Sequence, residues 1–99
     1  MAYQIVWTQS AQQGLAQLVE YIASDDPIAA ERFGLAIIEH VEQVSHHPKS
    51  GRVVPEFQIT KLRELIFSPY RLIYEVGDED DCIYVVRIWH AARGKPSLD

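Results

Sequence analysis

Apolar and polar residues alternate at the start of the chain. Tyr3, Ile5 and Trp7 are large apolar residues separated by single positions. This period of two is typical of a strand with one buried face. We therefore expect a strand over residues 3–7.

After this segment the apolar period becomes helical, which indicates two helices that each bury one face. The two apolar sets are Leu15, Leu18, Val19 and Ile22, then Phe33, Ile37, Val41 and Val44. Thr8 is suited to cap the first helix, with Ser10 as a competing candidate, and Asp26 followed by Pro27 is suited to begin the second. The second helix should end near His46-His47-Pro48, because the residue before a proline disfavours the helical conformation. The pattern predicts an antiparallel helix hairpin.

Three apolar segments with short connections follow the predicted hairpin. They span residues 62–67, 70–76 and 82–90, and they are separated by Ser68-Pro69 and by Gly77 with the acidic residues 78–81. Short connections join antiparallel neighbours, whereas residues 48–61, punctuated by proline and glycine, are expected to form a loop. We predict an α+β fold in which a mainly antiparallel four-stranded sheet, including the N-terminal strand, carries the hairpin on one face. A single domain over residues 1–99 is expected.

Composition narrows the class of protein. The chain of 99 residues is 47% hydrophobic and 23% charged, as in ordinary globular domains with one core. It contains no apolar run near the roughly 18 residues of a membrane span and no N-terminal secretory signal. The single Cys82 fits a reducing compartment, so we expect a cytoplasmic protein with no membrane partner.

The charge is unevenly distributed. The net charge is −5, which argues against general nucleic-acid binding. Residues 1–48 contain six acidic residues and one basic residue, whereas residues 49–99 contain eight of each, four of the acids within residues 78–81. The sheet half is therefore expected to be locally basic.

Known cofactor and metal motifs are missing from the sequence. It has no glycine-rich phosphate loop, zinc-ligand spacing or nucleophile elbow. The adjacent His46 and His47 would point about 100° apart on a helix and would not converge on one ion. We expect neither a cofactor nor a metal site.

Basic side chains occupy several positions of the predicted sheet. Strict alternation would place Arg87 on the same face as Val85 and Trp89, and His90 with Val86 and Ile88. Trp89 is more consistent with packing than with stacking on a nucleic-acid base. Several cations on one face would repel one another unless an anion binds there.

A second interpretation of these cations needs no ligand. The arginines on the strands would then cover a sheet face and pair with Glu64, Glu75 and each other. Both interpretations remain open from the residues alone.

Two ordered motifs resemble a known family. The run Arg63-Glu-Leu-Ile-Phe-Ser-Pro-Tyr-Arg-Leu-Ile-Tyr74 precedes an acidic turn and then Val85-Val-Arg-Ile-Trp-His-Ala-Ala-Arg93. Together with the loop Gly51-Arg-Val-Val-Pro-Glu56, this order resembles the RelE/ParE toxins of type II toxin–antitoxin systems. The resemblance covers essentially the whole chain. It implies a protein that arrests growth when free and is silenced by a cognate antitoxin in a toxin–antitoxin hetero-oligomer.

The resemblance implies two possible targets, of which we give first preference to ribosome-associated mRNA cleavage without metal. That reaction requires a base, a cation at the phosphate and an acid. The positions that match the family pattern are Glu56 as base, Arg71 as phosphate stabiliser, His90 as acid and Arg93 as a second cation. Further contacts with nucleic acid are expected from Lys61, Arg63 and Arg87. The chain departs from RelE in having no tyrosine after Arg93.

The alternative target is DNA gyrase. A ParE-like toxin would use the same sheet face as a binding surface and would need no catalytic group. A third interpretation is a toxin-like subunit without toxicity of its own, which the acidic net charge keeps open.

Overall fold

The computed structural model describes residues 2–98. The helices are α1 (Gln9–Ala23) and α2 (Pro27–Glu42), with short 3₁₀ helices at Gln43–Ser45 and Ala91–Arg93. The strands are β1 (Gln4–Trp7), β2 (Arg52–Val53), β3 (Leu62–Phe67), β4 (Tyr70–Gly77) and β5 (Cys82–His90).

Both helices begin at the predicted caps. The Thr8 side chain accepts a hydrogen bond from the Ala11 amide at 3.2 Å, and the Asp26 carboxylate accepts one from the Ala29 amide at 3.1 Å. Pro27 occupies the first turn of α2, where its missing N–H is harmless. The α-helix ends at Glu42, earlier than predicted, because the chain tightens into the 3₁₀ helix that carries the buried Val44.

Within residues 2–98, the sheet has five strands, in the order β1-β5-β4-β3-β2. The prediction of four strands is wrong because Arg52 and Val53 pair with β3. This strand is too short to produce a visible alternation inside a loop segment. β1 runs parallel to β5, and the other neighbours are antiparallel, so the α+β fold and the mainly antiparallel sheet are confirmed.

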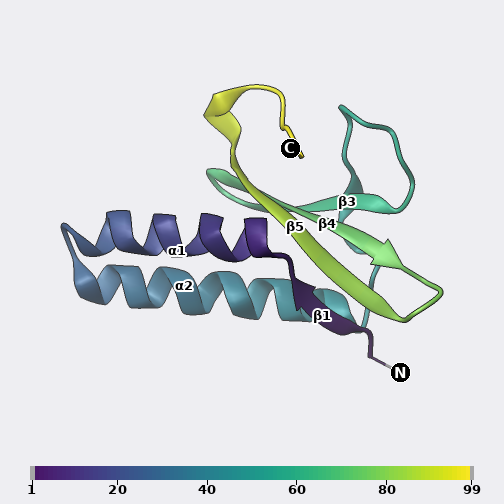
Figure 1. The fold of residues 1–99 in the computed structure, drawn as a ribbon, viewed down its shortest axis with the longest axis horizontal. Helices are drawn as coiled ribbons and strands as arrows, with labels where there is room; N and C mark the ends of the chain where they lie inside the picture. The colour runs from purple at the N-terminus through teal and green to yellow at the C-terminus, as the bar shows by residue number, and fades with distance from the viewer. Residues whose placement is uncertain (1, 99) are drawn as a thin grey trace.

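The sheet is covered on both faces. The antiparallel helices α1 and α2 lie together on one face (Figure 1), and Ile37 and Val41 of α2 pack there against Leu72 and Val85. On the other face, Val54 in the loop between β2 and β3 packs with Ile73 and Trp89. Each face therefore has its own apolar cluster.

A bulge in β5 interrupts the alternation of side chains. Tyr74 pairs with Val85, but the preceding Ile73 pairs with Arg87, so Val86 is an extra residue. As a result, Val85 belongs to the cluster under the helices, whereas Trp89 belongs to the cluster on the opposite face. The prediction that Arg87 shares one face with both residues is wrong for this reason.

Candidate functional site

Arg71 lies near the start of β4 on the face opposite the helices. Its cross-strand partner is Trp89, which packs in the outer apolar cluster. The Arg71 side chain is only 10% exposed, so its charge requires partners within the protein.

Two carboxylates surround the Arg71 guanidinium. Its Nη1 and Nη2 donate to the two carboxylate oxygens of Glu56 at 2.9 and 2.6 Å, a bidentate geometry. Its Nε donates to Glu64 at 2.6 Å. Glu64 is 0% exposed at its side chain and also accepts a hydrogen bond from Arg52. The four residues form an ion-pair network between β2, β3, β4 and the loop after β2.

This network determines the protonation of its members. The hydrogen bonds from Arg71 lower the pKa of Glu56 from 4.5 to about 2. The same hydrogen bonds, with those to Glu64, raise the pKa of Arg71 above its already high value. Glu56 is therefore a weak base, and the charge of Arg71 is neutralised by its neighbours.

His90 lies on the other face of the sheet. Its cross-strand partner is Tyr70, whose ring is 5.3 Å from the imidazole and 5.5 Å from the Phe33 ring on α2. The His90 Nδ1 accepts a hydrogen bond from the Ala92 amide at 3.0 Å. In this arrangement the hydrogen of the neutral ring is on Nε2.

Arg87 and Arg93 both contact the Trp89 indole. Their guanidinium carbons lie 5.5 and 4.5 Å from the ring centroid, respectively. Trp89 is 6% exposed, and its Nε1 donates to the Gly94 carbonyl at 3.1 Å. The contacts agree with the predicted packing role of Trp89.

The remaining predicted cations lie elsewhere. Arg63 donates from Nη1 to the Gly51 carbonyl at 2.9 Å and so braces the loop before β2. Lys61 is exposed just before β3, and it lines a depression together with Asp78, Glu79 and Asp80 of the acidic turn, among other residues. Neither of them adjoins the pocket that contains His90.

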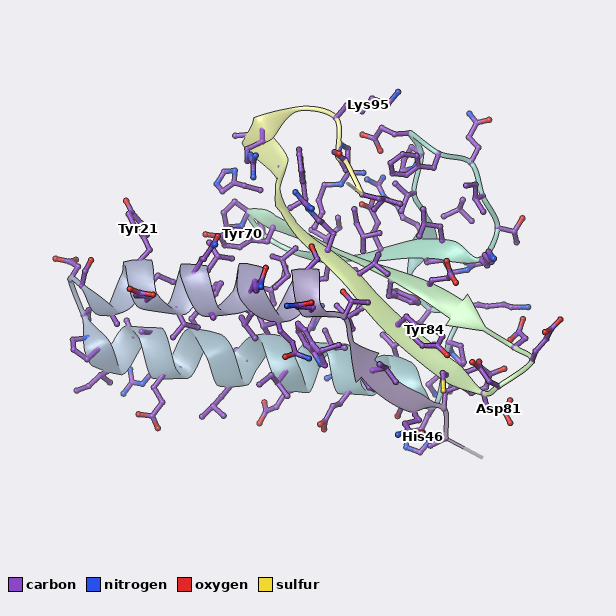
Figure 2. All side chains as sticks on the ribbon, viewed as in Figure 1. Tyr21, His46, Tyr70, Asp81, Tyr84 and Lys95 are labelled. Atoms are coloured by element: carbon purple, nitrogen blue, oxygen red, sulfur yellow. The ribbon has the colours of Figure 1, made fainter. Side chains whose placement is uncertain are left out.

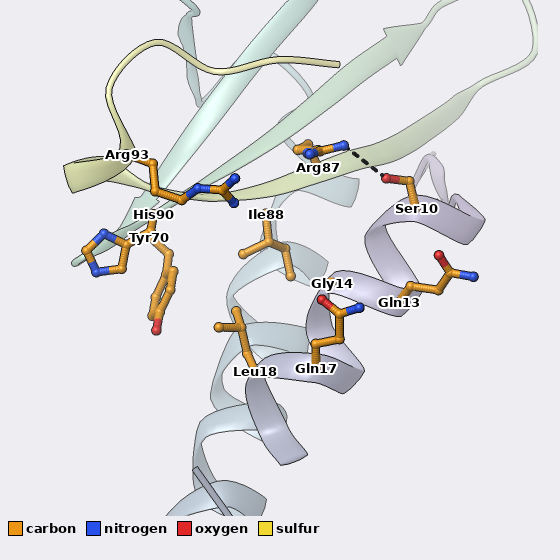
Figure 3. Close-up of a pocket in the computed structure, with 10 residues that line it drawn as sticks. All are labelled: Ser10, Gln13, Gly14, Gln17, Leu18, Tyr70, Arg87, Ile88, His90 and Arg93. Atoms are coloured by element: carbon orange, nitrogen blue, oxygen red, sulfur yellow. Dashed lines mark hydrogen bonds between the residues drawn. The ribbon is translucent and has the colours of Figure 1, made fainter. Parts of the chain in front are cut away.

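The structure therefore divides the predicted site residues. Glu56 and Arg71 meet on the outer face, whereas Arg87, His90 and Arg93 line a pocket beside α1 (Figure 3). The expectation that the cations gather on one face is wrong for Arg71 and His90. His90 pairs with Tyr70, and Tyr70 and Arg71 are successive residues of β4, whose side chains point to opposite faces. The alternative interpretation, an arginine paired with Glu64, is confirmed for Arg71.

Sequence reasoning missed several residues that shape these sites. Arg52 was not considered as a partner of Glu64, because its strand was not predicted. Ser10, Gln13 and Gln17 of α1 line the pocket that contains His90. Their spacing along one side of a helix is visible in the sequence, but the strand that they face is not.

Residues 2–98 contain neither a membrane-spanning helix nor a cluster of metal ligands. In this range, no helix is both long and apolar enough to span a membrane. Over the same residues, no three histidine, cysteine or acidic side chains are grouped so that they could hold a metal ion.

Comparison with known proteins places the chain in one family. The model of the ParE toxin of type II toxin–antitoxin systems matches residues 5–94. The chain is 35% identical to Toxin RelE2 of Caulobacter vibrioides over 91 residues, which are 91% of this chain and 97% of the relative. It is 30% identical to the putative toxin Y4kP of Sinorhizobium fredii over 96 residues, 95% of this chain and 94% of the relative.

Solved structures show the same fold. The chromosomal ParDE system of P. aeruginosa aligns with a TM-score of 0.73 at 21% identity, covering 90% of this chain and 96% of that one. The RelBE2 toxin–antitoxin complex of Mycobacterium tuberculosis aligns with a TM-score of 0.67 at 22% identity, covering 91% and 99%. The chain belongs to the RelE/ParE family and is a toxin of a type II toxin–antitoxin system.

Proposed function

We propose that this toxin arrests growth by binding DNA gyrase and stabilising the gyrase–DNA cleavage complex, without catalysing a reaction itself. The observation that supports this most directly is the neutralisation of Arg71 by Glu56 and Glu64. Arg71 is then a structural residue, as expected for a protein that acts by binding and does not need this arginine for catalysis.

An RNA-cleaving site would need a different arrangement. Base, cation and acid must reach the same phosphate. Glu56, with its pKa near 2, is a poor proton acceptor, and His90 lies on the opposite face of the sheet from Arg71. The match to a ParE toxin model over residues 5–94 agrees with the non-catalytic proposal.

A cognate antitoxin is part of the proposal. The similar solved structures include a toxin–antitoxin complex and a ParDE system. We propose that an antitoxin binds this chain in the cytoplasm as a hetero-oligomer and keeps it from its target. Loss of the antitoxin would then release the toxin.

Regulated expression of the chain, with and without its antitoxin, tests the target. We expect induction of the toxin alone to accumulate gyrase–DNA cleavage complexes and to induce the SOS response, while pulse-labelled protein synthesis continues at first. Co-expression of the antitoxin should abolish both effects. Intact DNA together with an immediate block of translation would contradict the proposal.

Metal-independent cleavage of ribosome-bound mRNA is the second candidate. It is favoured by the grouping of His90 with Arg87 and Arg93 in one pocket, because an imidazole exchanges protons near neutral pH. On this alternative, primer extension should reveal cleaved transcripts after induction, and His90→Gln should remove them without unfolding the protein. Unchanged transcripts in the wild type would rule it out. The absence of all these effects would instead support the third interpretation, a non-toxic subunit.

A further inference from the structure

The chain leaves the sheet directly after β5. The last backbone contact with the neighbouring strand connection is made by Ala91, whose amide donates to the Pro69 carbonyl at 2.9 Å. The chain then forms the 3₁₀ helix Ala91–Arg93, and Gly94 follows with a φ of 82°, a conformation that glycine adopts readily. Residues 92–94, here called the C-terminal turn, are therefore held to the domain through side chains of β5.

The C-terminal turn covers the Trp89 indole. The Arg93 guanidinium carbon lies 4.5 Å from the centroid of the ring, and the indole Nε1 donates to the Gly94 carbonyl at 3.1 Å. Trp89 is 6% exposed, although it is the last residue but one of its strand. The burial of the indole therefore depends in part on the conformation of this turn.

His90 fixes the C-terminal turn through one ring nitrogen. Its Nδ1 accepts a hydrogen bond from the Ala92 amide at 3.0 Å and so caps the 3₁₀ helix. The common helix caps are serine, threonine, aspartate and asparagine, whose oxygen acceptors do not change near neutral pH. A histidine can accept at Nδ1 only while it is neutral, because both ring nitrogens carry hydrogens once it is protonated. Protonation therefore removes this cap.

The surroundings of His90 contain no carboxylate that would compensate its positive charge. None of the described residues that line the pocket beside it is aspartate or glutamate, and the side chains that α1 contributes there are neutral (Figure 3). The titratable or charged groups are Tyr70 of β4, Arg87 of β5 and Arg93. Toward α2, the ring of Tyr70 contacts Phe33. A protonated imidazole would share this pocket with the Arg93 guanidinium, and their repulsion would add to the loss of the cap.

We propose that His90 is a protonation-sensitive cap that controls whether the C-terminal turn covers Trp89. With a neutral imidazole, the Ala92 amide has its acceptor and the turn lies on the indole. Protonation removes the acceptor and loosens the turn, which exposes the indole to water. Histidine side chains change charge at about pH 6.5, so the turn is held above this pH and loosened below it. This switch belongs to the free toxin and does not depend on the identity of the target.

Hydrogen exchange at the Trp89 indole N–H tests the switch. The exchange is measured by NMR on the purified toxin at pH 8 and pH 5, and a short tryptophan-containing peptide supplies the intrinsic effect of pH. We expect the protection of the indole N–H to fall about fivefold or more between pH 8 and pH 5, as for the loss of a helix cap. Equal protection at the two pH values would overturn the proposal.

Two substitutions of His90 separate the cap from other effects of acid. His90→Asn places a carboxamide oxygen where Nδ1 lies and keeps an acceptor that does not titrate, so the protection should stay high at both pH values. His90→Gln places its polar atoms one bond further from the backbone, so the protection should be low at both. A fall in His90→Asn as large as in the wild type, or high protection in His90→Gln, would overturn the proposal.

A second histidine of the same aromatic cluster provides the matched control. His40 of α2 contacts the Phe67 ring at 5.5 Å, and it has no contact with the C-terminal turn among the described residues. His40→Asn should therefore leave the fall in protection as in the wild type. Loss of the fall in this variant would assign the effect of acid to His40 and overturn the role of His90.

Discussion

The Glu64 carboxylate has no exposed surface, and two arginines compensate its negative charge. Arg71 and Arg52 each donate to one of its oxygens. The two pairs differ in environment, since the Arg71 side chain is 10% exposed and that of Arg52 is 60% exposed. Loss of a buried partner leaves a charge without compensation, whereas an exposed partner is replaced by water.

Arg71→Ala should therefore lower the free energy of unfolding by about 3–5 kcal/mol. Arg52→Ala serves as the matched control and should cost about 1 kcal/mol or less. Urea denaturation followed by circular dichroism measures both values. Equal losses in the two variants would show that the buried pair has no special role.

The Glu56–Arg71 pair also predicts a pH dependence of stability. Because the pKa of Glu56 is lowered from 4.5 to about 2 in the folded protein, its contribution is complete above pH 4.5 and is lost as the pH falls toward 2. Glu56→Gln should flatten the decline of the melting temperature in this acidic range. If the melting temperatures of the wild type and the variant fall equally from pH 5 to pH 2.5, the expectation is contradicted.

At the scale of elements, both helices depend on side chains that precede them. The Thr8 hydroxyl both caps α1 and donates to the Val85 carbonyl at 3.0 Å, so it also ties the helix to β5. The Asp26 side chain caps α2, and within residues 2–98 it makes no hydrogen bond to the sheet. A substitution of Asp26 therefore measures what the helix cap alone contributes to the free energy of unfolding.

Asp26→Ala should destabilise the protein by about 1 kcal/mol, because it leaves an amide in the first turn of α2 without its acceptor. Asp25→Ala changes the neighbouring carboxylate and should cost less than about 0.5 kcal/mol. Thermal melts of the two variants make the comparison. A larger loss in Asp25→Ala would mean that the cap has been assigned to the wrong residue.

At the scale of the whole molecule, an apolar groove lies along the helix hairpin, bordered at one end by Trp7 of β1. Trp7, Leu15, Val19, Leu35 and Ile38 line this groove, which has a volume of about 630 Å³. Leu35 is 56% exposed, and Tyr21, 78% exposed, projects from α1 (Figure 2). Apolar surface of this kind typically marks an interaction site, and under the proposed function the antitoxin is the expected partner.

Leu35→Ser should weaken antitoxin binding at least about tenfold, the effect of losing about 1.5 kcal/mol or more of apolar burial. Its free energy of unfolding should change little, since the side chain is already exposed in the toxin. Glu39→Ser, on the exposed surface of the same helix, is the control for calorimetric titration with the antitoxin. Unchanged affinity in Leu35→Ser would place the antitoxin on another surface.

Much of the fold could be predicted because its signals are local. The Thr8 and Asp26 caps, the helical periods and the short connections between strands each depend on residues close in sequence. The two-residue strand Arg52–Val53 could not be predicted, since its pairing with Arg63 and Glu64 is a contact across a loop. The Val86 bulge likewise has no local signal, because it depends on the register between β4 and β5.

By itself, the sequence determined the α+β class, the helix boundaries near their caps, the family and the residues that could carry charge. The tertiary structure decided which of those residues meet. Arg71 pairs with Glu56 and Glu64, whereas His90 lies with Arg93 beside α1. Strand register and one bulge decide this, because they determine the face to which each side chain points. Register is a property of paired strands, so a list of charged positions cannot contain it.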